Sequence, residues 1–185
     1  MPRTLSASMP LPTSVVLWTS LISVHSKSRE SLPEAVRLYQ KMLCSDVVPD
    51  KVTFIVMLKT SSVILDVRLG RKLHLQVVEE NLETDEFVCN SLLDMYMKCG
   101  HIDEATQLFH KMHHGFVDNV VSWTSLIAGY VAGNLWEEAI NLFQEMMIKG
   151  TLPNEITFIT IFKACGNMLC AERGKRTHLH LLHRH

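Results

Sequence analysis

The chain has 185 residues, of which 47% are hydrophobic and 20% are charged, and its formal net charge at pH 7 is −1. This composition is typical of a folded protein and argues against a disordered chain. The near-zero charge gives no overall attraction to nucleic acid or to an anionic membrane, so RNA binding would have to depend on specific contacts. No apolar run approaches the ~20 residues of a membrane-spanning helix.

Residues 1–14 precede the first regular pattern. No Asp or Glu occurs within residues 1–29, whereas Ser and Thr are frequent, which is the composition of an organelle transit peptide. Pro2, Pro10 and Pro12 would interrupt the amphipathic helix that such a peptide forms. We therefore interpret residues 1–14 as the tail of a preceding repeat or an N-terminal extension, with a weak targeting signal.

From Val15 onward the sequence repeats itself about every 35 residues, a period that indicates stacked helical hairpins. An aromatic column and a column of small residues both follow this period. The aromatic column is Trp18, Phe54, Cys89, Trp123 and Phe158, and the small column is Ala35, Gly70, Ala105, Ala139 and Gly174. The predicted units are 15–50 (unit one), 51–85 (unit two), 86–119 (unit three), 120–154 (unit four) and 155–185 (unit five, truncated).

Each unit is predicted to contain two amphipathic helices. In unit four, Trp123, Leu126, Ile127 and Tyr130 are spaced i, i+3, i+4 and i+7 along the first helix. The second helices repeat the same spacing from the small column, as in Ala35, Leu38, Tyr39 and Met42 of unit one and in Gly174, Thr177, His178 and Leu181 of unit five. His74 and His178 hold matching positions in this spacing, so we interpret both as packing residues.

These units resemble the pentatricopeptide repeat family, in its plant form with alternating standard, long and short repeats. Segment 120–127 (VVSWTSLI) resembles the standard repeat, Val52-Thr53-Phe54 followed by 69–74 (LGRKLH) the long repeat, and 90–100 (NSLLDMYMKCG) the short repeat. Units two and five are then of the long type and unit three of the short type. The resemblance implies an all-α fold, a right-handed superhelical α-solenoid of stacked helix-turn-helix hairpins.

The resemblance also implies a function. Such proteins bind single-stranded RNA one base per repeat, and act on mitochondrial or chloroplast transcripts in editing, processing or stabilisation through protein partners. It implies no enzyme activity, no cofactor, no membrane contact and no small-molecule substrate. A cytidine deaminase extension is not expected, because the sequence has no His-x-Glu and no Cys-x-x-Cys.

In this family, the fifth and last residues of a repeat read the base, and the second residue wedges between bases. The reading pairs become Thr19 with Asp50, Asn90 with Asn119, and Thr124 with Asn154, which imply G, a pyrimidine (C over U) and A. The expected target is 5′-G-N-Y-A-N-3′. Ile55, Asp85 and Ile159 are expected to read weakly or not at all. The wedging residues would be Val16, Val52, Phe87, Val121 and Ile156.

Two other functions remain open from the sequence. A tetratricopeptide-like scaffold for protein partners has nearly the same period, but would lack the Val-Val-x-Trp-Thr-Ser openings. A truncated, inactive fragment of a longer RNA-binding protein would equally begin and end within repeats.

Metal and thiol chemistry is not expected. His178, His180, His183 and His185 alternate near the C-terminus, a pattern that we interpret as incidental rather than as a metal site. The five cysteines are expected to be reduced thiols that are buried or half-buried, with Cys165 and Cys170 structural.

Overall fold

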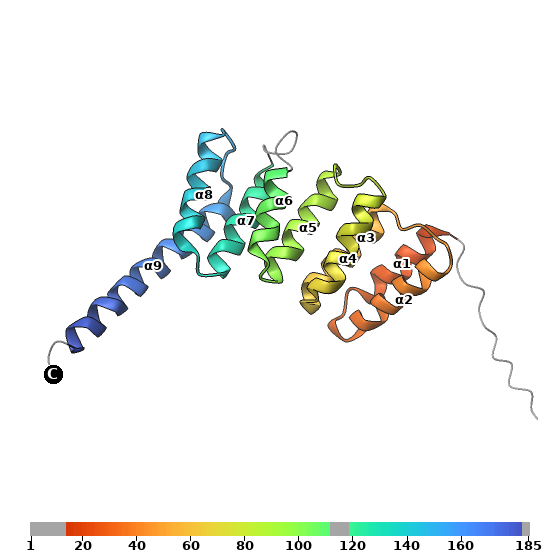
Figure 1. The fold of residues 1–185 in the computed structure, drawn as a ribbon, viewed down its shortest axis with the longest axis horizontal. Coiled ribbons are helices and arrows are strands. Elements are labelled where there is room, and N and C mark those ends of the chain that lie inside the picture. The colour runs from red at the N-terminus through yellow and green to blue at the C-terminus, as the bar shows by residue number, and fades with distance from the viewer. Residues whose placement is uncertain (1–13, 112–118, 183–185) are drawn as a thin grey trace, which may run out of the picture.

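The computed structural model describes residues 14–111 and 119–182, and for residues 172–182 it describes the backbone. Outside this part lie residues 1–13, which are all but the last residue of the tail expected at 1–14, residues 112–118, and His183 and His185. The described chain forms the helices α1 (Val15–His25), a short 3-10 helix η1 (Arg29–Ser31), α2 (Leu32–Cys44), α3 (Lys51–Ile64), α4 (Val67–Glu79), α5 (Glu86–Lys98), α6 (Ile102–Lys111), α7 (Val120–Ala132), α8 (Trp136–Ile148) and α9 (Glu155–Leu182) (Figure 1).

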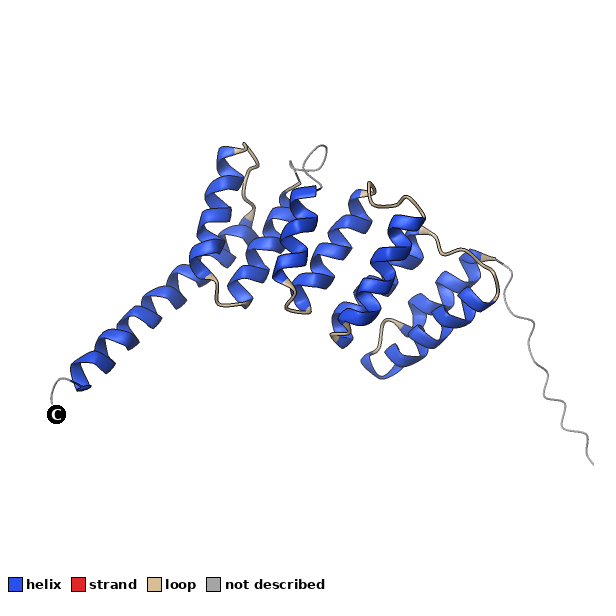
Figure 2. Ribbon diagram, viewed as in Figure 1, coloured by secondary structure: helices blue, strands red, loops and turns tan. Residues whose placement is uncertain are grey.

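The helices form two parallel rows. Each of α1, α3, α5 and α7 packs against the next of its kind, and α7 packs against α9, so these five make one row, the first-helix row. The remaining helices, α2, α4, α6 and α8, each contact the first-row helix before them and the one after them, and make the second-helix row. The result is an elongated stack of antiparallel hairpins (Figure 2). The predicted all-α solenoid is thereby confirmed.

The two columns read from the sequence lie at the centre of this stack. Trp18, Phe54, Cys89 and Trp123 are at most 1% exposed, and the small residues Ala35, Gly70, Ala105 and Ala139 are also buried. The small residues allow close approach: a Cβ atom added at Gly70 would lie 2.3 Å from Sδ of Met95 in α5. Periodic burial of this kind couples each hairpin only to its neighbours.

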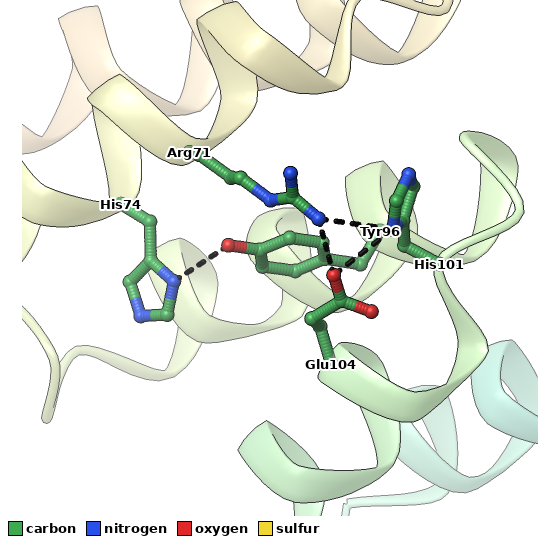
Figure 3. A network of polar contacts seen from close by, with 5 residues as sticks. All are labelled: Arg71, His74, Tyr96, His101 and Glu104. Carbon is green, nitrogen blue, oxygen red and sulfur yellow. Dashed lines mark hydrogen bonds and ion pairs between the residues drawn. The ribbon is translucent and has the colours of Figure 1, made fainter.

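A polar network joins α4, α5 and α6 at the surface (Figure 3). Arg71 Nη2 lies 2.5 Å from Glu104 Oε1, and His101 Nδ1 lies 2.9 Å from the same oxygen. Beside them, His74 Nδ1 and Tyr96 Oη are 2.9 Å apart, with ring centroids 5.7 Å apart in an edge-on arrangement. Hydrogen bonds from Arg71 and His101 lower the pKa of the Glu104 carboxyl, which keeps it ionised in this network.

The prediction of two helices in unit five is wrong, because α9 runs without interruption from Glu155 to Leu182. In unit two, Leu65 adopts a left-handed conformation (φ 57°) and Asp66 then caps α4 by accepting from Leu69 N. Cys170 lies as far after Phe158 as Asp66 lies after Phe54, so Cys170 holds in unit five the position that Asp66 holds in unit two. A thiol is a weak acceptor and a poor helix cap, so nothing at this point ends the helix.

The uninterrupted helix has a consequence for the aromatic column. The C-terminal half of α9 extends beyond the stack (Figure 1). Phe158, the fifth member of the column, is 44% exposed, and Phe162 one turn later is 70% exposed. Among the described residues, none of the helices combines the length and apolar composition needed to cross a lipid bilayer.

Candidate nucleic-acid interface

The five predicted wedging residues form a row of exposed apolar side chains, one at the start of each first-row helix. Their exposed fractions run from 47% for Val52 to 66% for Phe87. Four of them are exposed because each lies two residues before a buried member of the aromatic column, which on an α-helix is more than half a turn away from the packed face. The fifth, Ile156, precedes Phe158, which is itself 44% exposed. We call Val16, Val52, Phe87, Val121 and Ile156 the apolar row.

The predicted last residues of the units all cap the first-row helix that follows. Asp50 Oδ1 accepts from Thr53 N at 2.8 Å, and Asn154 Oδ1 accepts from Thr157 N at 2.9 Å. Asp85 and Asn119 cap α5 and α7 in the same way, through Phe87 N at 3.0 Å and Val121 N at 2.7 Å. Capping holds these side chains at the helix N-termini through Oδ1. The second terminal atom, Oδ2 of each Asp or Nδ2 of each Asn, is left for other partners.

In units one and four, a threonine joins the two predicted base-reading residues. Thr53 Oγ1 lies 2.6 Å from Thr19 Oγ1 and donates to Asp50 Oδ1 at 2.7 Å. The same arrangement recurs in unit four. There Thr157 Oγ1 lies 2.7 Å from Thr124 Oγ1 and donates to Asn154 Oδ1 at 2.9 Å.

The structure therefore brings together the fifth and last residues of units one and four, through Thr53 and Thr157. We call each of these threonine hydroxyls, with its two hydrogen bonds, a bridge. Neither of these two bridging residues is among the site residues predicted from the sequence. Their signal was present, because each is a threonine three residues after an Asp or Asn that ends a unit.

Asp50 and Asn154 differ in charge and in the atom that they leave available. In both, Oδ1 is occupied by the cap and by the bridging threonine, and neither side chain makes a further hydrogen bond within the described residues. The remaining atom is Oδ2 of Asp50, which accepts hydrogen bonds, and Nδ2 of Asn154, which donates them. The two sites thus share one geometry with opposite hydrogen-bonding polarity.

Unit two lacks a comparable site. Its fifth residue, Ile55, has no polar group and packs half-buried against the core. Its last residue, Asp85, has its second oxygen engaged, since Oδ2 lies 3.4 Å from Lys51 Nζ.

Unit three is different again. Asn90 Oδ1 accepts from Ser122 Oγ, and Asn119 Nδ2 donates to Glu86 Oε1. The structure therefore connects these two predicted readers to separate partners and not to each other. Asn90 keeps its Nδ2 atom available, whereas the Nδ2 atom of Asn119 is occupied.

Two hollows lie along the first-helix row. One of about 540 Å³ is formed by α5, α7 and the start of α9, and is lined by four predicted site residues: Val121, Thr124, Asn154 and Ile156. The other, of about 360 Å³, is lined by Lys27, Lys59 and Lys98 with serine and threonine hydroxyls. Lys98 lines both, so the two hollows adjoin. The three lysines were not among the sequence candidates.

The cysteines agree with the sequence expectation only in part. All five are free thiols, and burial raises the pKa of Cys89 to about 11, which makes this thiol unreactive. Cys44 and Cys170 are exposed, contrary to the expectation of burial. Both lie at helix surfaces outside the repeating buried positions.

The described residues contain no group of three or more potential metal ligands. The side chains of His178 and His180, and all of His183 and His185, lie outside the described part of the chain.

Comparison with protein families gives a single answer for most of the chain. The model of the PPR repeat family matches residues 13–61 and 118–167, which is more than half of the chain, and the PPR repeat model matches residues 87–114. A mitochondrial pentatricopeptide repeat-containing protein of Arabidopsis thaliana is 34% identical over 86% of this chain and 17% of its own length. A chloroplastic one is 34% identical over 91% of this chain and 27% of its own length.

Solved structures agree on the fold. The crystal structure of the pentatricopeptide repeat protein PPR10 from maize matches 92% of this chain and 25% of PPR10, with a TM-score of 0.70 and 19% identity. PPR10 in complex with an 18-nucleotide psaJ RNA element matches 83% of this chain and 22% of that protein, with a TM-score of 0.67 and 20% identity. The chain thus spans about a quarter or less of these proteins.

Proposed function

The chain belongs to the pentatricopeptide repeat family, and we propose that it binds single-stranded RNA along the first-helix row. Units one, three and four read G, a pyrimidine and A, so the target is 5′-G-N-Y-A-N-3′. The transcript is a mitochondrial or chloroplast RNA, as the names of its relatives suggest. The role is recognition rather than catalysis, and editing, processing or stabilisation is left to protein partners.

The observation that carries this proposal is the opposite polarity of Asp50 and Asn154 within one geometry. Guanine offers N–H donors on its Watson–Crick edge, which an acceptor such as Asp50 Oδ2 complements. Adenine offers a ring-nitrogen acceptor on that edge, which a donor such as Asn154 Nδ2 complements. Thr19 and Thr124 are short enough to leave room for a purine in both units.

Unit three is assigned a pyrimidine because Asn90 is longer than threonine and occupies the space that the larger base would need. Its available Nδ2 atom is a donor, which suits the O2 acceptor of a pyrimidine. Asn119 contributes less than Asp50 or Asn154, because Glu86 occupies its Nδ2 atom. Units two and five, with Ile55, Asp85 and Ile159, are left without a base assignment.

The apolar row and the lysines supply contacts that do not depend on sequence. Exposed apolar side chains such as Phe87 can insert between consecutive bases. Lys59 and Lys98 lie on α3 and α5, and Lys27 follows the end of α1; all three line one hollow and can neutralise phosphates, despite the near-neutral whole molecule.

Affinity from this chain alone is expected to be modest. A specific base contact contributes about 1–3 kcal/mol, and only three units are readers. The relatives are several times longer than this chain. Selective binding of a transcript would therefore use further repeats or a protein partner.

The test is a titration of the chain with a labelled RNA that contains G-N-Y-A-N, and with one in which G and A are exchanged. The exchanged RNA should bind at least about tenfold more weakly, because both purines then face the wrong polarity. Equal affinity for the two RNAs would contradict the base assignment. Absence of binding to either RNA, at low salt and with a folded chain, would contradict RNA binding itself.

A further inference from the structure

We infer that the third residue of a first-row helix sets the base specificity of the preceding unit. Thr53 would do so for unit one and Thr157 for unit four, although both belong to the following unit of the predicted division. This inference rests on the proposed function, and adds residues that the fifth-and-last pairing leaves out. Thr53 and Thr157 are fully buried, so their role is to position other side chains rather than to touch RNA.

The hydrogen atoms of unit one can be assigned from their partners. A carboxylate only accepts, so the Thr53 hydroxyl gives its single proton to Asp50 Oδ1. Thr19 then gives its proton either to Thr53 Oγ1, at 2.6 Å, or to the Val15 carbonyl oxygen, at 2.8 Å. Both acceptors lie inside the protein. In either case Thr19 offers the base a lone pair and not a proton.

The bridge also fixes the plane of the Asp50 carboxylate. Oδ1 accepts from both Thr53 N and Thr53 Oγ1, at 2.8 and 2.7 Å. Two bonds from different directions hold the carboxylate against rotation and so determine where Oδ2 lies. With the backbone bond alone, the side chain could turn about its last torsion, and the position of the reading atom would vary.

In unit four the cap at Thr157 N decides which end of the amide faces the groove, and the Thr157 hydroxyl adds a second bond to the same oxygen. Asn154 Oδ1 accepts from Thr157 N and Thr157 Oγ1, both at 2.9 Å. If the amide rotated by half a turn, its NH2 group would face the Thr157 N–H, donor against donor. The cap therefore keeps Nδ2 available as the donor that adenine requires, and the hydroxyl bond holds the plane of the amide, which determines where Nδ2 lies.

The other units support the connection between bridge and reader. In unit two the equivalent third residue is Val88, which has no hydroxyl, and the fifth residue is the apolar Ile55. In unit three the Ser122 hydroxyl donates to Asn90 but, within the described residues, makes no hydrogen bond to the Asn119 side chain, whose Nδ2 bonds Glu86 instead, so the bridge is only half present. Polar fifth residues thus occur where the next helix offers a hydroxyl at its third position.

The decisive variant is Thr53→Val, which keeps the shape of the side chain and removes its hydroxyl. Affinity is measured for three RNAs: G-N-Y-A-N, A-N-Y-A-N, in which A replaces the first base, and G-N-Y-G-N, in which G replaces the fourth base. The native chain should prefer G over A in unit one by about tenfold. In Thr53→Val this preference should fall to threefold or less, while the preference for A in unit four is retained.

Two control variants separate the bridge from general packing. Ser61→Ala removes a hydroxyl from the same helix, at a residue that is fully buried and donates to the Asp66 carbonyl oxygen at 2.6 Å. It should leave both base preferences unchanged. Thr53→Ser restores a hydroxyl and should restore the preference for G. Thr157→Val should reduce only the preference for A in unit four, which keeps the test independent of how Thr53→Val folds.

The outcomes distinguish this inference from the proposed function. If the native chain prefers G in unit one and both valine variants retain their preferences, the bridge does not set specificity, while the proposed function stands. If Ser61→Ala loses the preferences as Thr53→Val does, the effect is one of packing, and the inference is overturned. If the native chain binds RNA without preference, the base assignment fails first and the inference fails with it.

Discussion

Gly129 in α7 lies directly against Met97 in α5, between units three and four. A Cβ atom added at Gly129 would lie 1.9 Å from Met97 Cε and 3.0 Å from Met97 Cβ. Gly129→Ala should therefore lower the free energy of unfolding by about 1–3 kcal/mol, because the added methyl group overpacks the contact between two first-row helices. Urea denaturation followed by circular dichroism measures this change.

Two controls identify the cause of that loss. Gly166→Ala places a methyl group in open space on α9, and should be neutral or stabilising by up to about 1 kcal/mol through helix propensity. In a Met97→Ala background, Gly129→Ala should cost less than in the native chain. An equal cost in both backgrounds would show that the contact with Met97 is not the reason.

Exchanging Asp50 and Asn154 should exchange the bases that they read. Asp50→Asn changes the available atom from an acceptor to a donor, so unit one should come to prefer A over G. Asn154→Asp should make unit four prefer G. Both residues remain good helix caps, so stability should change little. Fluorescence anisotropy with the four RNAs that carry G or A at these two positions measures the exchange. An unchanged preference in both variants would exclude these residues as readers.

Phe87→Ala tests the apolar row. The side chain is 66% exposed at the start of α5, so its loss should scarcely affect stability. Removing a residue that stacks on bases should weaken RNA binding by about 1–3 kcal/mol, regardless of sequence.

Leu75→Ala is the matched control for Phe87→Ala. Leu75 is also 66% exposed but lies on α4, in the second-helix row, and its loss should leave affinity unchanged. Similar losses in the two variants would mean that RNA does not follow the first-helix row.

His74 should make the protein less stable in mild acid. Burial lowers the pKa of His74, with a contribution from Lys111 in the same direction and an opposing one from Glu83. A pKa that is lower in the folded chain than in the unfolded chain means that unfolding takes up a proton. Stability is therefore complete above the unfolded pKa, about 6.5, and decreases as the pH falls below it.

His74→Gln should reduce this dependence while keeping a hydrogen-bonding partner for Tyr96 Oη. Unfolding by urea at pH 7.5 and at pH 5.5 gives the measurement, and the other histidines contribute equally to both proteins. A native chain and a His74→Gln variant with the same loss of stability would contradict the assignment.

The sequence was sufficient for the hairpin stack because its evidence is periodic. Trp18, Phe54 and Trp123 recur at one spacing and are buried in one column, since each hairpin meets its neighbour in the same way. The same period placed Asp50 and Asn154 at the ends of their units. The resemblance to pentatricopeptide repeats then assigned both side chains to base reading.

Three features could not be read from periodicity. The bridges through Thr53 and Thr157 depend on distances between neighbouring helices, which a single repeat does not contain. The engagement of Asn119 by Glu86 also crosses between helices. The continuous α9 reflects a missing cap at Cys170, where the apolar spacing still favoured a second helix. In each case a local contact decided what the repeating pattern left open.

The cap that Asp50 forms on α3 has a practical consequence for protein engineering. A designer who transplants repeats as cassettes would naturally splice the chain at the 50/51 junction. Such a splice brings a foreign residue to the position of Thr53 and separates Asp50 from the hydroxyl that orients it. Splicing after Thr53 would carry the reading residue and its support together, so that each cassette keeps its own base preference in a new host.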